Sequence, residues 1–460
     1  MNEKLKSFNE YLKNKKIAII GAGVSNIPLI EILKNKNYDI TIFDKKELKD
    51  MEQNTKKLIE KNNIKTSLGE NYLENLTNFD VIFRSPSFLP TNPYLKKEAD
   101  RGALVTTEIE QVIKLSPSKI IGVTGSKGKT TTTTIIYEIL KCLGYSCYLG
   151  GNIGTPLYSK LDDMKKEDIV VLELSSFQLM NMTVSPNIAV IINISPDHLD
   201  VHGSYEEYIN AKRQIYLNQT ENDIVVLNND DEIVKKFAKD AKGKVRYFSK
   251  DYIKDTYILE NDFITYNKEK IIDTRNLLLK GKHNYLNICT ALNTIKDYIN
   301  VSNEKLQEII ANIKPVPHRL EYIRTINGVK WYNDSASTSP DKALGGINAF
   351  KEKIVLIAGG YDKKISYEPI AMPIAEKVSK LILFGQTKNM IYDEIMKLPR
   401  ELTENLEIYV MDTLEEVVDI ANKISTKDEV VLFSPASASF DMFKNAYQRG
   451  DIFKDLVNKL

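Results

Sequence analysis

The sequence is poor in cysteine, in net charge and in long apolar runs, and each of these absences excludes a class of protein. Three cysteines in 460 residues cannot form a disulfide framework, and an odd number fits a reducing compartment. Lysine plus arginine (63) nearly equals aspartate plus glutamate (62), so no net field draws the chain to nucleic acid or to an anionic membrane. The apolar runs, such as IAVIINI, are far shorter than the roughly 20 residues that cross a bilayer, and the charged N-terminus lacks the apolar core of a secretory signal. We expect a cytoplasmic protein with no nucleic-acid partner and no membrane insertion.

Short β-branched runs alternate with amphipathic helical stretches almost from end to end. This alternation is typical of parallel sheets covered by helices, so the predicted class is α/β. A chain of this length exceeds one ordinary core, and prolines interrupt the rhythm in LSPSK (115–119) and KPVPHRLE (314–321). We predict three domains, residues 1–115, 116–314 and 315–460.

The strongest single signal is a glycine-rich turn between a predicted strand over 119–124 and a helix that begins near Lys129. In GSKGKT (125–130), glycines let backbone N–H groups face a phosphate, Lys129 reaches the β and γ phosphates, and Thr130 can bind Mg²⁺. The general phosphate-loop pattern has a glycine where Val123 stands, so the loop is a shortened form. The alternative is an ordinary glycine turn before a helix.

Polar side chains follow the next predicted strands. Glu173 ends VVLE, and NIAVIINIS leads through Ser195 to His198, so both should meet Thr130 at the carboxyl edge of the sheet. Zinc is a poor fit, because the nearest second histidine, His202, sits in a predicted glycine-bearing loop. Magnesium, which keeps waters and takes few protein oxygens beside phosphates, fits better. Taken singly, Glu173 is better explained by a local cap or pair, and His198 is equally well explained as a satisfied loop histidine.

An ordered set of motifs runs through all three segments: TGSKGKTTT, GGNIGTP, LELSSFQL, ISPDHLDVHGSYEEYINAKRQIY, GKHNYLNICTA, PHRLE, WYNDSAST, AGGYDKK and SPASASFDMFKNAYQRGDIF. The set resembles the Mur ligases, and LELSSFQL with SPASASFD and QRG favours the members that add D-glutamate. Three positions depart from the family pattern: Ala336 stands where a lysine is frequent, Ala446 where some members have an aromatic, and Ser87 where a glycine is common.

The resemblance implies a Rossmann-like UDP-binding domain, a central P-loop-type ATPase with a mostly parallel sheet, and a Rossmann-like domain for the amino acid. It implies an ATP-dependent ligase that adds D-glutamate to UDP-N-acetylmuramoyl-L-alanine through an acyl phosphate and a tetrahedral intermediate. Such an enzyme makes a peptidoglycan precursor and so serves the cell wall, cell shape and division. We expect it to act as a monomer.

The resemblance also implies a role for each matched residue. The catalytic residues are Lys129, Glu173, His198 and Lys212. Two Mg²⁺ ions are implied, one on Thr130 and Glu173, the other on His198 and a Lys212 carbamylated by CO₂. The ATP-binding residues are Gly125, Ser126, Lys127, Gly128, Lys129, Thr130, Thr131, Asn284, Asn287, Arg319 and Asp334. The UDP-sugar residues are Val24, Ser25, Asp44, Asn152, Ser175 and Gln178, and the D-glutamate residues are Thr338, Lys363 and Ser439.

The N-terminal motif IAIIGAGVSN, with Asp44 some 20 residues on, alone suggests a dinucleotide site or a glycine turn without a ligand, because Asn26 replaces the third glycine. The resemblance makes UDP the better ligand. Three alternatives for the whole chain stay open: a related ligase for another amino acid, a folate-type polyglutamate ligase, and a nucleotide-gated module without chemistry.

Overall fold

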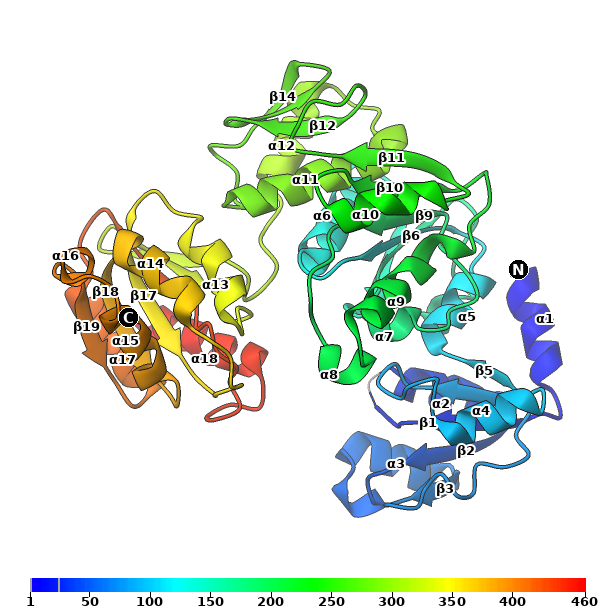
Figure 1. The fold of residues 1–460 in the computed structure, drawn as a ribbon. Helices are drawn as coiled ribbons and strands as arrows, with labels where there is room; N and C mark the ends of the chain where they lie inside the picture. The colour runs from blue at the N-terminus through cyan, green and yellow to red at the C-terminus, as the bar shows by residue number, and fades with distance from the viewer. Residues whose placement is uncertain (1, 24) are drawn as a thin grey trace. The chain divides into compact units, whose positions relative to one another are not determined.

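The computed structural model describes residues 2–23 and 25–460 (Figure 1). The chain forms two compact units, residues 1–270 with 287–302 and residues 271–286 with 303–460. Each is described by itself below. Among the described residues, no helix is long and apolar enough to cross a bilayer.

A five-stranded parallel sheet of order β3-β2-β1-β4-β5 opens the first unit. Its strands are β1 (Lys16–Ile20), β2 (Asp39–Asp44), β3 (Lys65–Leu68), β4 (Val81–Arg84) and β5 (Leu104–Thr106). Its helices are α1 (Glu3–Leu12), α2 (Ile27–Asn35), η1 (Leu48–Asp50), α3 (Gln53–Lys61), α4 (Pro93–Asp100) and α5 (Glu108–Leu115). All four residues of β4 are buried, as expected for a strand covered on both faces.

A six-stranded parallel sheet of order β11-β10-β9-β6-β8-β7 follows in the first unit. Its strands are β6 (Lys119–Thr124), β7 (Cys147–Gly151), β8 (Ile169–Glu173), β9 (Ile188–Ile191), β10 (Ile224–Asn228) and β11 (Lys244–Phe248). Its helices are α6 (Lys129–Cys142), η2 (Tyr158–Lys160), α7 (Ser176–Leu179), α8 (Leu199–His202), α9 (Tyr205–Leu217), α10 (Glu232–Lys236) and η3 (Phe237–Lys239). The order places the carboxyl ends of β6, β8 and β9 side by side.

A smaller three-stranded sheet, β12-β13-β14, follows along the chain. Its strands are β12 (Tyr257–Glu260), β13 (Phe263–Tyr266) and β14 (Glu269–Asp273), followed by α11 (Lys282–Ile295), η4 (Lys296–Tyr298) and α12 (Asn303–Ala311).

The second unit holds a six-stranded sheet of order β15-β16-β20-β17-β18-β19, parallel except for β15. Its strands are β15 (Glu321–Ile326), β16 (Val329–Asn333), β17 (Lys353–Gly359), β18 (Val378–Phe384), β19 (Glu407–Val410) and β20 (Glu429–Phe433). Its helices are α13 (Pro340–Ile347), α14 (Glu368–Lys377), α15 (Lys388–Met396), α16 (Arg400–Thr403), α17 (Leu414–Ile424) and α18 (Ala446–Lys459). The β15–β16 turn has φ of 50° at Asn327 and 84° at Gly328, as a type I′ hairpin requires.

The three cysteines are free thiols. Cys142, the last residue of α6, is exposed, Cys147 is half-buried and Cys289 is buried in α11. Burial raises the pKa of Cys147 to about 11 and raises the pKa of Cys289 further.

Candidate active site

The glycine-rich turn joins β6 to α6, as the sequence predicts. Gly125 has φ of 154° and Gly128, which caps α6, has φ of 85°, a region that favours glycine. A Cβ on Gly128 would lie 2.8 Å from Asn287 Oδ1, and one on Gly125 would lie 3.1 Å from Ile192 Cβ. The two glycines therefore allow the turn to lie close to neighbouring segments at the N-terminus of a helix, where anions bind.

Asn193 fixes this phosphate loop, and sequence reasoning missed it. The Asn193 Oδ1 atom accepts from the amides of Ser126 (3.1 Å) and Lys127 (2.8 Å), and its Nδ2 donates to Lys127 O (3.0 Å). The predicted strand through Ser195 is wrong in this region, because β9 ends at Ile191. The chain leaves the sheet because its next polar groups bind elsewhere: the Ser195 amide, for example, donates to Ser126 Oγ at 2.9 Å.

The same serine connects the loop to helix α9. Ser126 Oγ lies 2.8 Å from Tyr208 Oη, and the Tyr208 ring packs beneath Lys212, whose Nζ is 4.7 Å from the ring centroid. Helix α9 begins after Ser204, whose side chain accepts from the Glu207 amide and caps the first turn. Lys212 thus reaches the phosphate loop from two turns inside a capped helix.

Two lysines converge on one carbonyl. Lys129 Nζ donates to Gly125 O at 2.8 Å and to Ser126 O at 3.1 Å, while Lys212 Nζ donates to the same Gly125 O at 2.9 Å. Lys212 is only 1% exposed. Burial, followed by the positive charge of Lys129, lowers the pKa of Lys212 well below the usual range of an ammonium group. The surroundings of Lys212 therefore disfavour its ammonium form.

Glu173 ends β8 beside the loop and is 1% exposed. Its Oε1 accepts from Asn152 Nδ2 at 2.8 Å, whereas its Oε2 is buried with no hydrogen-bond partner among the described residues. A buried carboxylate oxygen without a donor is costly unless a cation pairs with it. This buried oxygen therefore fits a cation such as Mg²⁺, which prefers oxygen ligands.

The two histidines of the segment lie in different environments. His198, with φ of 55°, has a side chain that is 52% exposed, and its Nε2 lies 3.7 Å from Asp197 Oδ2. His202, predicted in a loop, ends the short helix α8 and is buried, with its Nε2 2.9 Å from Ser176 Oγ. Both rings pack against Phe177. Within the described part of the chain, no group of three or more His, Cys, Asp or Glu side chains is arranged to hold a metal ion.

The remaining ATP-binding candidates fall in both units. In the first, Thr131 is half-buried in the first turn of α6, and Asn287 Oδ1 accepts from Thr132 Oγ1 at 3.3 Å. In the second, the buried Asn284 donates to Lys280 O at 2.7 Å, and Arg319 is half-buried ahead of β15.

Two cavities hold most of the UDP-sugar candidates. Ser25, Asn152 and Gln178 line one cavity of about 220 Å³, and Asp44 lines another of about 360 Å³. Ser175 and Gln178 form a reciprocal cap on α7, since each backbone amide donates to the other side chain. Val24 lies outside the described residues.

The D-glutamate candidates lie in loops after three neighbouring strands. Thr338 follows β16, Lys363 follows β17 and Ser439 follows β20, and these strands are adjacent in the order β16-β20-β17. Lys363 is exposed and Ser439 is buried. The sheet therefore brings the three loops to one edge.

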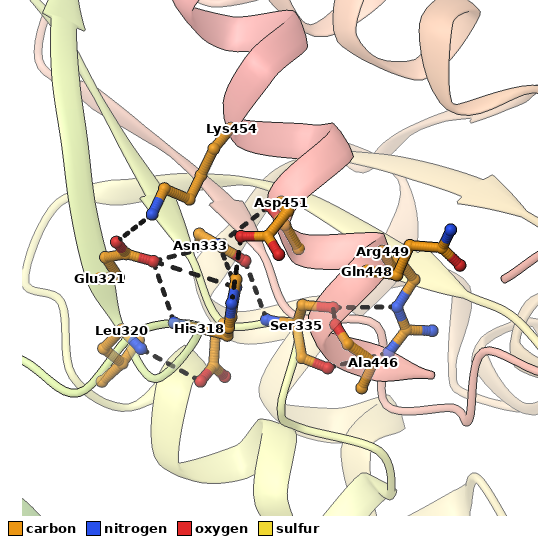
Figure 2. Close-up of polar contacts among 12 residues, drawn as sticks. His318, Leu320, Glu321, Asn333, Ser335, Ala446, Gln448, Arg449, Asp451 and Lys454 are labelled. Carbon is orange, nitrogen blue, oxygen red and sulfur yellow. Dashed lines mark hydrogen bonds and ion pairs between the residues drawn. The ribbon is translucent and has the colours of Figure 1, made fainter. Parts of the chain in front are cut away.

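Helix α18 contacts the segment that leads into β15 (Figure 2). Its Asp451 lies 3.5 Å from His318 Nε2, and its Lys454 donates to Glu321 Oε1 at 2.6 Å. A Cβ on Gly450 would lie 2.2 Å from His318 Nδ1, so only glycine fits there. The helix thus supports the segment that leads to Arg319.

Family models match most of the chain. They are the MurD N-terminal domain over residues 16–93, the Mur ligase middle domain over 123–295, and the Mur ligase glutamate ligase domain over 318–437. The chain belongs to the Mur ligase family. The predicted three-domain α/β fold and ligase class are confirmed.

Individual relatives of this Mur ligase agree with the family models. Two proteins named UDP-N-acetylmuramoylalanine--D-glutamate ligase, from Clostridium botulinum and Clostridium tetani, are each 43% identical over 461 residues, covering all of both chains. Solved structures with a similar fold include UDP-N-acetylmuramate-alanine ligase MurC from Thermotoga maritima, with a TM-score of 0.61, 20% identity and coverage of 97% of this chain and 100% of that one. Another is MurF ligase from Thermotoga maritima in complex with ADP, with a TM-score of 0.57, 19% identity and coverage of 98% and 97%.

Asp334 of this Mur ligase is buried at the end of β16. Its Oδ2 accepts from Ser337 Oγ (2.6 Å) and Ser434 Oγ (2.8 Å), and its Oδ1 accepts from the Leu320 amide (3.2 Å). Burial raises the pKa of Asp334 from 3.8 to about 6, although these hydrogen bonds oppose the shift. The Asp334 carboxylate connects three segments by hydrogen bonds, but burial makes its charged form energetically unfavourable.

Replacing Asp334 by asparagine should therefore remove a pH dependence of stability. Between about pH 4 and pH 6 the folded chain holds a proton that the unfolded chain has released, so the free energy of unfolding falls as pH rises through this window. Two pH units correspond to about 3 kcal/mol. Trp331 is the one tryptophan and is fully buried in β16, in the same compact unit as Asp334. Its fluorescence during urea unfolding therefore measures the free energy of unfolding of that unit. Parallel curves for wild type and Asp334→Asn from pH 4 to pH 6.5 would contradict the assignment.

Proposed function

We propose that the protein adds D-glutamate to UDP-N-acetylmuramoyl-L-alanine at the expense of ATP, making a peptidoglycan precursor. The observation that carries the proposal is the 43% identity, over the full length of both chains, to the two clostridial enzymes of that name. The phosphate loop with Lys129, Glu173 and Lys212 supports it independently, because these groups suit phosphoryl transfer. The three free thiols support a site of action in the reducing cytoplasm.

Each domain takes one substrate in this proposal. Residues 1–115 bind the UDP group, residues 116–314 bind ATP, and residues 315–460 bind D-glutamate. The cavities around Ser25 and Asp44 support the first assignment, and the phosphate loop supports the second. The convergence of three loops that carry Thr338, Lys363 and Ser439 supports the third.

The reaction has two chemical steps. A carboxylate oxygen of the muramoyl-alanine attacks the γ-phosphorus of ATP, the bond from this phosphorus to the bridging oxygen breaks, and ADP leaves. The neutral amine of D-glutamate then attacks the acyl carbon, and its nitrogen releases a proton to solvent as the tetrahedral intermediate expels phosphate and leaves the amide. Lys129 and the amides at the start of α6 stabilise the negative charge that the phosphates carry during transfer.

Magnesium ions would neutralise phosphate charge in this site. Thr130 and Glu173 would hold one ion, and the buried Glu173 Oε2 supports that assignment. A carbamate on Lys212, with His198, would hold the second. The burial of Lys212 close to Lys129 supports the carbamate, because an anion beside Lys129 is favoured where a second cation is disfavoured.

A product assay tests the function directly. Product mass and phosphate release would be measured with Mg-ATP, UDP-N-acetylmuramoyl-L-alanine and a panel of D-Glu, L-Glu, L-Lys and meso-diaminopimelate. We expect an adduct only with D-Glu, despite Ala336 and Ala446. Turnover with another amino acid would support the proposed mechanism but contradict the proposed amino-acid substrate. Turnover with a folate acceptor would indicate a polyglutamate ligase. ATP binding without any product would indicate a nucleotide-gated module that has no catalytic activity.

A further inference from the structure

Arg449 is a fully buried cation whose partners are almost all backbone carbonyls. It lies in the first turn of α18 and is 0% exposed. Its Nε donates to Ser335 Oγ (3.0 Å) and its Nη2 to Ser335 O (2.9 Å) (Figure 2). Its Nη1 donates to Ala438 O (2.8 Å), and Nη2 also reaches Ser437 O (3.1 Å). Four hydrogen bonds from one rigid guanidinium therefore join two loops that lie about 100 residues apart in sequence.

The charge of Arg449 has no direct counter-ion. Among the described residues no carboxylate forms an ion pair with it, although Asp441 is near enough to act on it through space. Burial lowers the pKa of Arg449 to about 10, so the side chain stays charged at neutral pH. A charged arginine held by neutral partners leaves a positive field at this edge of the sheet.

Three strand ends meet at this side chain. Ser335 follows β16, and Ser437 with Ala438 follows the adjacent β20. After β17, Gly360 has φ of 145°, and a Cβ there would lie 3.0 Å from Arg449 Nη1 and 2.3 Å from Ala438 O. The guanidinium occupies the space that a side chain on Gly360 would need.

Binding the carbonyls fixes the direction of the amides that follow them. In a planar trans peptide the C=O and the next N–H point to opposite sides. The Ser335 carbonyl faces Arg449, and the Ala336 amide accordingly turns away and donates to His318 O at 3.0 Å. By the same geometry, the Ala438 carbonyl that binds Arg449 turns the Ser439 amide to the opposite side.

We propose that Arg449 is a positioning residue that sets the loops carrying Thr338 and Ser439 to receive the carboxylates of the incoming amino acid. The inference rests on the proposed function. Arg449 does not touch the amino acid. It acts by holding the Ser439 amide outward and the two loops at a fixed separation, over a positive charge that favours an anionic substrate.

Steady-state kinetics of the full-length enzyme test the proposal. In Arg449→Lys the charge remains, but one ammonium cannot span carbonyls on two loops as a guanidinium does. We expect the KM for D-glutamate to rise about tenfold or more, while the KM values for ATP and UDP-N-acetylmuramoyl-L-alanine change less than about twofold. Ser335→Ala removes one acceptor and the 2.7 Å hydrogen bond to Ala446 O, and should raise the KM for D-glutamate by a smaller factor.

A matched control separates positioning from loss of stability. Val457 is fully buried in the same helix, in the apolar cluster that contains Trp331, and does not contact the loops through polar groups. Val457→Ala should lower the urea midpoint of Trp331 fluorescence and leave the KM for D-glutamate unchanged. The proposal is overturned if Arg449→Lys and Ser335→Ala keep the wild-type KM, or if Val457→Ala raises it equally. If Arg449→Lys does not fold, Ser335→Ala decides. Failure of the wild-type enzyme to ligate D-glutamate would instead contradict the proposed function.

Discussion

Replacing Lys212 by alanine is expected to lower turnover by about 10²–10³-fold or more, the range seen when a preorganised electrostatic group is lost from a site. Lys212 is 1% exposed and shares the Gly125 carbonyl with Lys129. If it works as a carbamate, a short-chain carboxylate such as acetate should enter the space left in the alanine variant and restore part of the activity. Phosphate release at increasing acetate concentration measures this rescue.

Arg213→Ala is the matched control for that variant. Arg213 lies next to Lys212 on α9 but pairs with Asp240 on the other side of the helix, so its loss should change turnover less than about twofold. Absence of rescue in the Lys212 variant, together with a native mass spectrum showing an unmodified Lys212, would remove the carbamate.

Replacing Lys129 by alanine should lower kcat/KM for ATP by about 10²–10³-fold, because the residue stabilises charge on the transferred phosphoryl group. The fold should persist, since the hydrogen bonds from Asn193 that hold the phosphate loop do not involve the Lys129 side chain. Initial rates against ATP concentration, with unfolding monitored separately, measure the two effects.

Lys141→Ala provides the comparison at the other end of α6. Lys141 is exposed and lies over the Tyr137 ring, away from the phosphate loop. We expect wild-type kinetics from it. Substantial ligation by Lys129→Ala would show that the loop does not bind ATP in the proposed way.

Local signals predicted those parts of the fold that short sequence patterns specify. Strand β6 and the start of α6 at Lys129 follow from a β-branched run and glycines that permit left-handed backbone. The Asn327-Gly328 hairpin follows from turn chemistry in the same way. The end of β9 was wrong because a distant partner overrides β-propensity: hydrogen bonds to the phosphate loop pull residues 193–195 out of the sheet.

The site was predicted less completely than the fold, for a related reason. The rule that parallel strands end at one edge predicts that Thr130, Glu173 and His198 share a crevice, and β6 and β8 are indeed neighbours in the sheet. The roles of Asn193 and Arg449 depend on which strands are neighbours and on which carbonyls turn inward. Those facts arise from packing between segments up to about 110 residues apart, as Arg449 and Ser335 illustrate with a separation of 114. No local pattern around either residue specifies them.

The exposed thiol at the end of α6 gives the enzyme a natural attachment point for a fluorescent dye. Cys142 lies thirteen positions after Lys129 in the same helix, which places the two about 20 Å apart at 1.5 Å per residue. Burial keeps Cys289 and, less fully, Cys147 protonated and slow to react at neutral pH. A maleimide dye would therefore label Cys142 first, on the helix whose opposite end carries the proposed nucleotide site, and binding could be followed without introducing or removing a cysteine.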